Sequence, residues 1–392
     1  MVRTQGFHLC NRSSILLRAT RKLRIFSGLS YFIYIKSWSM FNTSLYLSLK
    51  YIISLMRFSK SIPDYIKVTD SLYTGLDNTQ LPLKVIKGPN SLNRTLILYP
   101  GASPFAEKHP SMIFLASVLA NIGFSVYIPR IPLLKDLDIS EKNVDWFVNA
   151  YSQIIARDDI IGSKVSCMGV SYGGAILLKS SLQESMLSSP PHSITTYGTI
   201  YDVHKSLDFL INGKIIIKGK EVSIKPHEWG LVVCFHNFLN SIDIGYVTSD
   251  IEKILKLRVQ DRHDEVEAER LKLSGSDRLL VDDILSSTIS PEVKRILDII
   301  FTDKMDALDG ISPKNWCDQI KSKVFVMHGA NDNMVPYTQS VALAEHIKNS
   351  ELFISYLYEH NEIAPKRSFF YKLNELRRIL FFIKMFIRHH ER

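Results

Sequence analysis

The chain has 392 residues, of which 46% are hydrophobic and 22% are charged, a composition that is ordinary for a globular protein with a large core. Its four cysteines lie far apart and form no CxxC pair, which argues against a zinc site and against a disulfide framework. The excess positive charge is confined to one end, since residues 1–63 contain ten Lys or Arg and no Asp or Glu. The rest of the chain has 38 Lys and Arg, the 48 of the whole chain less these ten, against 39 Asp and Glu. No folded basic face is indicated, so we expect no nucleic-acid partner.

Residues 1–61 are expected to form a basic, apolar extension that precedes the folded body. The apolar stretches at 25–35 and 45–56 are too short for a membrane-spanning helix, which needs about 20 apolar residues. Three interpretations stay open: a targeting peptide, an amphipathic helix at 42–58 on a membrane surface, or a start assigned too early, with Met40 as the initiator. The stripe that would face the membrane comprises Leu45, Leu49, Ile52, Ile53 and Met56. We favour a dispensable first segment of 39 residues followed by the peripheral helix, in a protein that is cytoplasmic, membrane-associated or targeted to an organelle.

Residues 62–202 alternate between short apolar strands and helices. Weak strands are predicted at 65–68 and 81–86. Further strands are predicted at 94–99, 124–128, 164–168 and 193–200, and helices at 109–122, 141–156 and 175–182. This alternation predicts an α/β fold with a mostly parallel, doubly wound sheet that carries helices on both faces. In such sheets, ligands bind at the carboxyl ends of the strands.

Residues 203–319 break this pattern and are mostly helix and loop. The segment is too long for a simple connection, so we interpret it as a helical cap inserted over the strand ends. The sheet resumes in residues 320–392, with strands at 323–328 and 352–357 and a basic amphipathic helix at 368–389. That last helix either packs against the sheet or contacts a membrane, and packing is the commoner arrangement.

The segment Gly169-Val170-Ser171-Tyr172-Gly173 joins a predicted strand to a predicted helix. A serine at such a turn has strained backbone geometry, with its hydroxyl pushed out of the sheet. Gly169 and Gly173 are needed because side chains there would collide with the neighbouring strand and helix. The arrangement is typical of a nucleophilic serine.

An activated serine needs a base, and the base needs an acid that orients it. Asp332 follows the predicted strand 323–328, and His360 follows the last strand. The order Ser171, Asp332, His360 is the order expected for nucleophile, acid and base in this architecture. The alternatives are Asp202 for the acid and His109, His328 and His346 for the base. We expect His328 to brace the acid turn and His346 to lie on the surface.

Backbone donors for an oxyanion are expected at two places. The loop 99–103, after the first parallel strand, can present the N–H of Ala102, and Tyr172 can present its own N–H at the start of the serine helix. Such donors stabilise negative charge that develops in the transition state.

On these motifs, residues 64–203 and 320–392 resemble the α/β-hydrolases, with the nucleophile elbow at Ser171 and the acid turn at Asp332. The resemblance departs from the common pattern at Tyr99-Pro100-Gly101, where His-Gly is usual.

The resemblance implies a serine hydrolase of the carboxylesterase or lipase kind, which cleaves an ester or related acyl bond through an acyl-enzyme intermediate and needs no cofactor and no metal. The apolar cap residues favour a small, apolar acyl substrate, or else form the core of the cap. These residues are Phe209, Leu210, Trp229, Leu231, Phe235 and Phe238. Two alternatives stay open: a non-catalytic scaffold that binds a lipid or a protein, and an acyltransferase that uses the same three residues.

Overall fold

A computed structural model describes the chain over residues 43–89, 92–160, 162–217, 219–356 and 369–391. The first 42 residues of the predicted extension and His360, the predicted base, lie outside these ranges.

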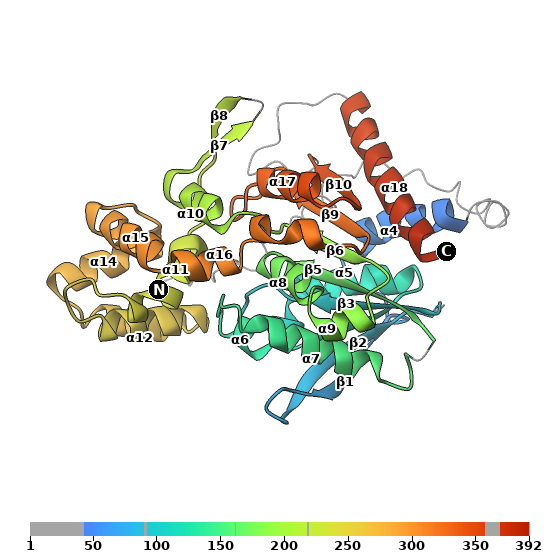
Figure 1. Cartoon of the computed structure of the whole chain (residues 1–392), viewed down its shortest axis with the longest axis horizontal. Helices are drawn as coiled ribbons and strands as arrows, with labels where there is room; N and C mark the ends of the chain where they lie inside the picture. The colour runs from blue at the N-terminus through green and yellow to red at the C-terminus, as the bar shows by residue number, and fades with distance from the viewer. Residues whose placement is uncertain (1–42, 90–91, 161, 218, 357–368, 392) are drawn as a thin grey trace, which may run out of the picture.

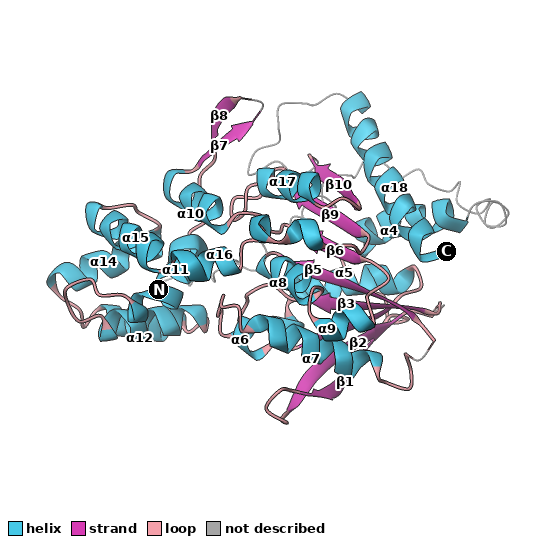
Figure 2. Cartoon of the chain, viewed as in Figure 1, coloured by secondary structure: helices cyan, strands magenta, loops and turns pink. Residues whose placement is uncertain are grey.

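An eight-stranded sheet forms the centre of the molecule (Figure 2), in the order β1-β2-β4-β3-β5-β6-β9-β10. β2 runs antiparallel to both of its neighbours, and all other neighbouring strands are parallel. The strands are β1 Lys67–Thr74, β2 Gln80–Lys87, β3 Arg94–Tyr99, β4 Ser125–Pro129, β5 Lys164–Val170, β6 Ile194–Tyr197, β9 Val324–Gly329 and β10 Ser350–Ser355. The predicted α/β fold with a mostly parallel sheet is confirmed.

Helices cover both faces of this sheet because its inner strands are apolar on both sides. Successive residues of one strand enter opposite cores; on β5, for example, Cys167 belongs to one core and Met168 to the other. The first face is covered by α7 Asn143–Ile155, α8 Tyr172–Ser180, α9 Glu184–Ser188 and α17 Thr338–His346. The second face is covered by α4 Thr43–Phe58, α5 Pro110–Asn121 and α18 Phe369–Glu391. Two shorter helices, η2 Ala106–Lys108 and α6 Pro132–Lys135, follow β3 and β4.

The helix α4 is part of the packed body. Its buried apolar side chains are Leu47, Tyr51, Leu55 and Phe58, which pack with α5 and α18 over the second face of the sheet. The residues of the expected membrane stripe are only partly buried and lie beside this packed face. The expected start of the folded body near residue 62 therefore lies C-terminal to a helix that contributes to the core. Within the described ranges, no helix is both long enough and apolar enough to cross a bilayer.

The segment between β6 and β9 is mainly helical and lies to the left of the sheet in Figure 1. Its helices are α10 Val203–Asn212, α11 Trp229–Phe238, α12 Ser249–Val259, α13 His263–Arg270, α14 Gly275–Ser286, α15 Pro291–Asp303 and α16 Met305–Gly310, with short turns η3 Leu239–Ser241, η4 Pro313–Asn315 and η5 Cys317–Gln319. A hairpin of β7 Lys214–Ile217 and β8 Lys220–Ser223 was not predicted. Phe209, Leu231 and Phe235 are almost fully buried, so they help to form the core of this segment.

Candidate active site

Ser171 alone joins β5 to α8, and its backbone is strained. Its φ of 54° and ψ of −130° are rare for any residue with a side chain, and such a conformation costs about 1–3 kcal/mol. Three hydrogen bonds hold it: the Ser171 N–H donates to the Tyr197 carbonyl at 2.8 Å, and its own carbonyl accepts from the Gly174 N–H at 2.9 Å and the Thr199 hydroxyl at 3.2 Å. The neighbouring strand β6 thus maintains the strained turn.

The glycines around Ser171 leave no room for side chains. A Cβ at Gly169 would lie 2.6 Å from the Gly173 carbonyl oxygen, and a Cβ at Gly173 would lie 2.1 Å from the Pro100 carbonyl oxygen. A Cβ at Gly174 would lie 1.9 Å from Oγ1 of Thr199. The first two collisions are the kind expected from the sequence, whereas Gly174 was not singled out.

The loop after β3 is pressed against the serine. A Cβ at Gly101 would lie 3.2 Å from the Cβ of Ser171, so the two backbones are in close contact. The next residue, Ala102, lies outside helices and strands, and its N–H donates to no acceptor in the described part of the chain. Tyr172 is the first residue of α8, where a backbone N–H has no acceptor in its own helix. Both predicted oxyanion donors therefore adjoin the serine turn.

Buried tyrosines anchor the segments on either side of the serine. Tyr99, at the end of β3, stacks on Phe147 with ring centroids 4.3 Å apart and donates its hydroxyl to the Phe147 carbonyl at 3.0 Å. Tyr172 donates its hydroxyl to the Ile139 carbonyl at 2.6 Å. Burial raises the pKa of both phenols well above its ordinary value, so they stay protonated donors. Tyr99, which departs from the usual family pattern, thus fixes the start of the loop by packing.

A buried ion pair holds the far end of the same loop. Glu107 in η2 is fully buried, and both of its carboxylate oxygens accept hydrogen bonds from Arg130, at 2.6 and 2.9 Å. The hydroxyl of Tyr73 donates to the Arg130 carbonyl. These contacts connect the loop to the ends of β1 and β4.

The carboxylate of Asp332 lies in the turn after β9. Its Oδ1 accepts the N–H groups of Met334 and Val335, each at 2.9 Å, and its Oδ2 lies 3.5 Å from Nε2 of His328. Burial alone would raise the pKa of Asp332, but the His328 contact and the two backbone N–H groups outweigh it and hold this pKa below its usual range. A Cβ on Gly198 would lie 3.3 Å from Oδ2, which places the carboxylate beside the end of β6. The same strand accepts the N–H of Ser171 through the Tyr197 carbonyl.

The alternative histidines have structural contacts. His328 is buried, with Nδ1 bonded to the Ser340 hydroxyl at 2.7 Å and Nε2 to the Val335 carbonyl at 2.9 Å. A carbonyl can only accept, so Nε2 carries a proton. Nε2 is thus paired within the acid turn, and Nδ1 is paired with α17. His346 bonds to a carbonyl of its own helix, and His109 caps α5 through Nδ1.

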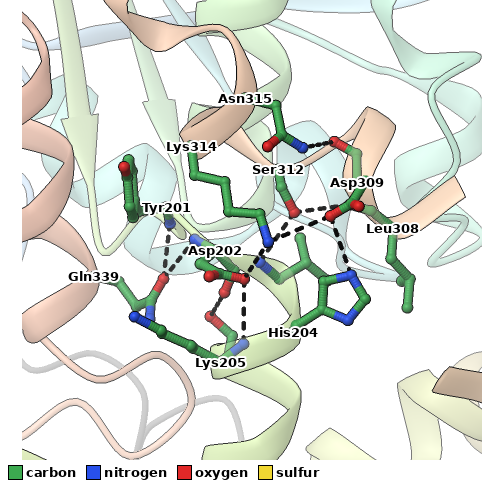
Figure 3. A network of polar contacts seen from close by, with 12 residues as sticks. Tyr201, Asp202, His204, Lys205, Leu308, Asp309, Ser312, Lys314, Asn315 and Gln339 are labelled. Atoms are coloured by element: carbon green, nitrogen blue, oxygen red, sulfur yellow. Dashed lines mark hydrogen bonds and ion pairs between the residues drawn. The ribbon is translucent and has the colours of Figure 1, made fainter. Parts of the chain in front are cut away.

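Asp202, the alternative acid, belongs to a polar network at the base of the cap (Figure 3). Its carboxylate caps α10 by accepting the Lys205 N–H at 3.4 Å, and it lies 3.3 Å from Nζ of Lys314. The side-chain oxygen of Gln339 accepts the N–H groups of Tyr201 and Asp202, at 3.0 and 2.7 Å. Asp202 thus joins the first cap helix to the last cap segment and to α17.

His360 lies outside the described residues, but the strand that precedes it, β10, is described. The carbonyl of Ser355, the last residue of β10, accepts the N–H of Ala330 at 2.8 Å, so the chain leaves β10 beside the acid turn. His360 follows five residues later. Sequence reasoning missed Thr199 and Gly174, because their contact joins helix α8 to the loop after β6 and no local pattern signals it. No group of three or more His, Cys, Asp or Glu side chains in the described ranges is placed to hold a metal ion.

Comparisons with known proteins find structural likeness alone. No family model matches the chain, and no curated protein matches it in sequence. Acylaminoacyl peptidase from Pyrococcus horikoshii is 12% identical, with a TM-score of 0.44 over 85% of this chain and 42% of that one, so this chain spans less than half of the peptidase. The 2-hydroxy-6-oxo-6-phenylhexa-2,4-dienoate hydrolase of Rhodococcus sp. strain RHA1 is 17% identical, with a TM-score of 0.39 over 74% and 90% of the two chains. An esterase from Exiguobacterium antarcticum is 14% identical, with a TM-score of 0.40 over 81% and 100%.

At these identities and TM-scores, the matches carry no argument about substrate or reaction. The fold follows from the chain itself: a mostly parallel eight-stranded sheet with β2 reversed, helices on both faces and a strained serine turn between a central strand and its helix. The chain has the α/β-hydrolase fold, with a mainly helical segment inserted between β6 and β9.

Proposed function

We propose that the chain is a serine hydrolase that cleaves an ester or a related acyl bond. The observation that carries this proposal is the strained backbone of Ser171, which is in close contact with the loop of Ala102. A fold does not need a strained residue at this turn for stability, and such strain is concentrated at functional sites.

In the proposed reaction, Oγ of Ser171 attacks the carbonyl carbon of the substrate while His360 takes the hydroxyl proton. The N–H groups of Ala102 and Tyr172 hold the oxyanion, and the proton passes to the leaving alcohol as the bond to the acyl carbon breaks. Water then attacks the acyl-enzyme by the reverse sequence, giving the acid and free Ser171. Asp332 orients the histidine ring, and its lowered pKa supports an ionised carboxylate in this role.

We propose a small substrate with an apolar acyl group, of the kind that carboxylesterases and lipases accept. Support comes from Phe238 and Trp229, which are only partly buried in the cap and so leave apolar surface that a substrate could contact. Phe209 and Phe235, in contrast, are almost fully buried in the core of the cap. Transfer of the acyl group to an acceptor other than water would use the same residues.

A fluorophosphonate probe tests the proposal, because it reacts covalently with an activated serine and needs no knowledge of the substrate. We expect labelling of the wild type, loss of labelling in Ser171→Ala, and full labelling in Ser276→Ala, a control at an exposed serine of α14. Hydrolysis of p-nitrophenyl esters of increasing chain length then defines the acyl group. Equal labelling of the wild type and Ser171→Ala would end the proposal and favour a non-catalytic scaffold.

A further inference from the structure

An apolar cavity lies on the second face of the sheet, away from the helix of the serine turn. Its floor is formed by β5, β6, β9 and β10, and its roof by α4, α5 and α18. Its volume is about 50 Å³. One ordered water occupies roughly 10–15 Å³, so the cavity is larger than a single water requires.

Two hydroxyl groups of the floor have no hydrogen-bond partner. Thr195 on β6 is 4% exposed and Ser355 on β10 is 7% exposed, and neither Oγ1 of Thr195 nor Oγ of Ser355 finds a partner among the described residues. In the sheet, Thr195 is flanked by Met168 and Phe325, which offer it no side-chain acceptor or donor. A buried hydroxyl without a partner is destabilising, so a bound molecule that pairs with it is favoured.

The strand register shows that the cavity is elongated. Thr195 pairs with Phe325 on β9, whereas Ser355 pairs with Gly329, four residues further along the same strand. Strand geometry therefore separates the two hydroxyls by about 13 Å along the strands and about 10 Å across them. One polar group cannot pair with both hydroxyls over this span, so a ligand that pairs with Thr195 leaves Ser355 to another partner, and the elongated cavity has the shape of an extended chain.

The charge of the lining narrows the class of ligand. No Lys or Arg lines the cavity, and both ring nitrogens of His328, which borders it, already have partners, one in the acid turn and one on α17. A carboxylate buried here would be left uncompensated, which is strongly unfavourable.

We propose that this cavity binds a neutral linear aliphatic alcohol, with its chain under α18 and its hydroxyl on Thr195. The site is separate from the proposed catalytic serine and does not depend on catalysis.

Titration of the full-length protein with 1-decanol, decanoate and decane, followed by calorimetry and thermal shift, tests the proposal. We expect saturable binding of decanol and weaker binding of decanoate at neutral pH. Thr195→Val keeps the shape of the side chain and should weaken decanol binding about fivefold, the effect of one lost hydrogen bond, without changing decane binding. Thr196→Val is the matched control, because the Thr196 hydroxyl is also buried and unpaired but belongs to the opposite face of the sheet.

Ile383→Phe should fill the cavity and abolish decanol binding. If that variant fails to fold, the comparison of decanol binding by Thr195→Val and Thr196→Val tests the proposal. Three results would overturn the proposal: no saturable binding of decanol, equal effects of Thr195→Val and Thr196→Val, or decanol that protects Ser171 from the fluorophosphonate probe. The last result would place the alcohol at the catalytic site, whereas a catalytically inactive protein that still binds decanol would leave this proposal intact.

Discussion

Gly173→Ala should disable the site without unfolding the chain. The added Cβ would lie 2.1 Å from the Pro100 carbonyl oxygen, and Cβ atoms essentially never approach another atom within 3.0 Å. Because the obstacle is backbone, the loop that carries Ala102 must move away from the serine turn by about 1 Å. A displacement of this size in catalytic geometry costs about 10²-fold in rate, similar to the loss of one oxyanion donor.

Steady-state hydrolysis of p-nitrophenyl butyrate gives kcat and KM separately. We expect the loss in kcat, because the donor acts on charge that appears only in the transition state. Gly310→Ala is the matched control, since its Cβ would meet only the tip of the flexible Glu141 side chain, at 3.0 Å. If Gly173→Ala keeps wild-type kcat and wild-type labelling by the fluorophosphonate, the loop does not supply an oxyanion donor.

Three further predictions concern ionisable groups. Asp332→Asn should lower kcat by about 10⁴-fold, whereas Asp202→Ala should keep kcat and lower the free energy of unfolding in urea by about 1 kcal/mol, through loss of a helix cap. Arg130→Ala should lower the free energy of unfolding by about 3 kcal/mol in the same assay, because it leaves the carboxylate of Glu107 buried and unpaired. A double variant that also removes the Glu107 carboxylate should recover part of this loss. His390, on α18, is buried, and this burial lowers its pKa to about 3. Its contribution to stability is therefore complete above about pH 6.5 and is lost as the pH falls toward 3, and His390→Gln should flatten the dependence of urea stability on pH over this range.

Each of these three has a result that would contradict it. Similar losses of kcat in Asp332→Asn and Asp202→Ala would mean that Asp332 does not have a special role as the catalytic acid. Full stability of Arg130→Ala would show that water reaches Glu107. An unchanged pH profile in His390→Gln would mean that this histidine is protonated in the folded protein.

Sheet, helices and serine turn could be predicted because their signals are local. Each inner parallel strand is a short apolar run followed by a helix, and Gly169 and Gly173 flank the serine within five residues. Asp332 could be proposed because it follows a strand at the expected place in the chain. Such patterns depend on neighbours in sequence, so one chain is enough to recognise them.

The remaining features depend on contacts between distant segments. An apolar stripe has the same appearance in the sequence whether it faces lipid or protein, so the packing of α4 through Leu47, Tyr51 and Leu55 could not be told from membrane association. The same is true of the contact between Thr199 and Gly174, and of the unpaired hydroxyl of Thr195, since a side chain shows its lack of a partner only in three dimensions.

The position of α4 also bears on the order in which the molecule can fold. The second face of the sheet is covered by the first and the last described helices, α4 and α18, which contact each other directly. During synthesis from the N-terminus, Phe325 and Phe353 emerge before the aromatic residues of α18, such as Phe382, that cover them. Part of this face therefore stays open until α18 has been synthesised, and such long-range closure slows folding and exposes apolar surface to aggregation.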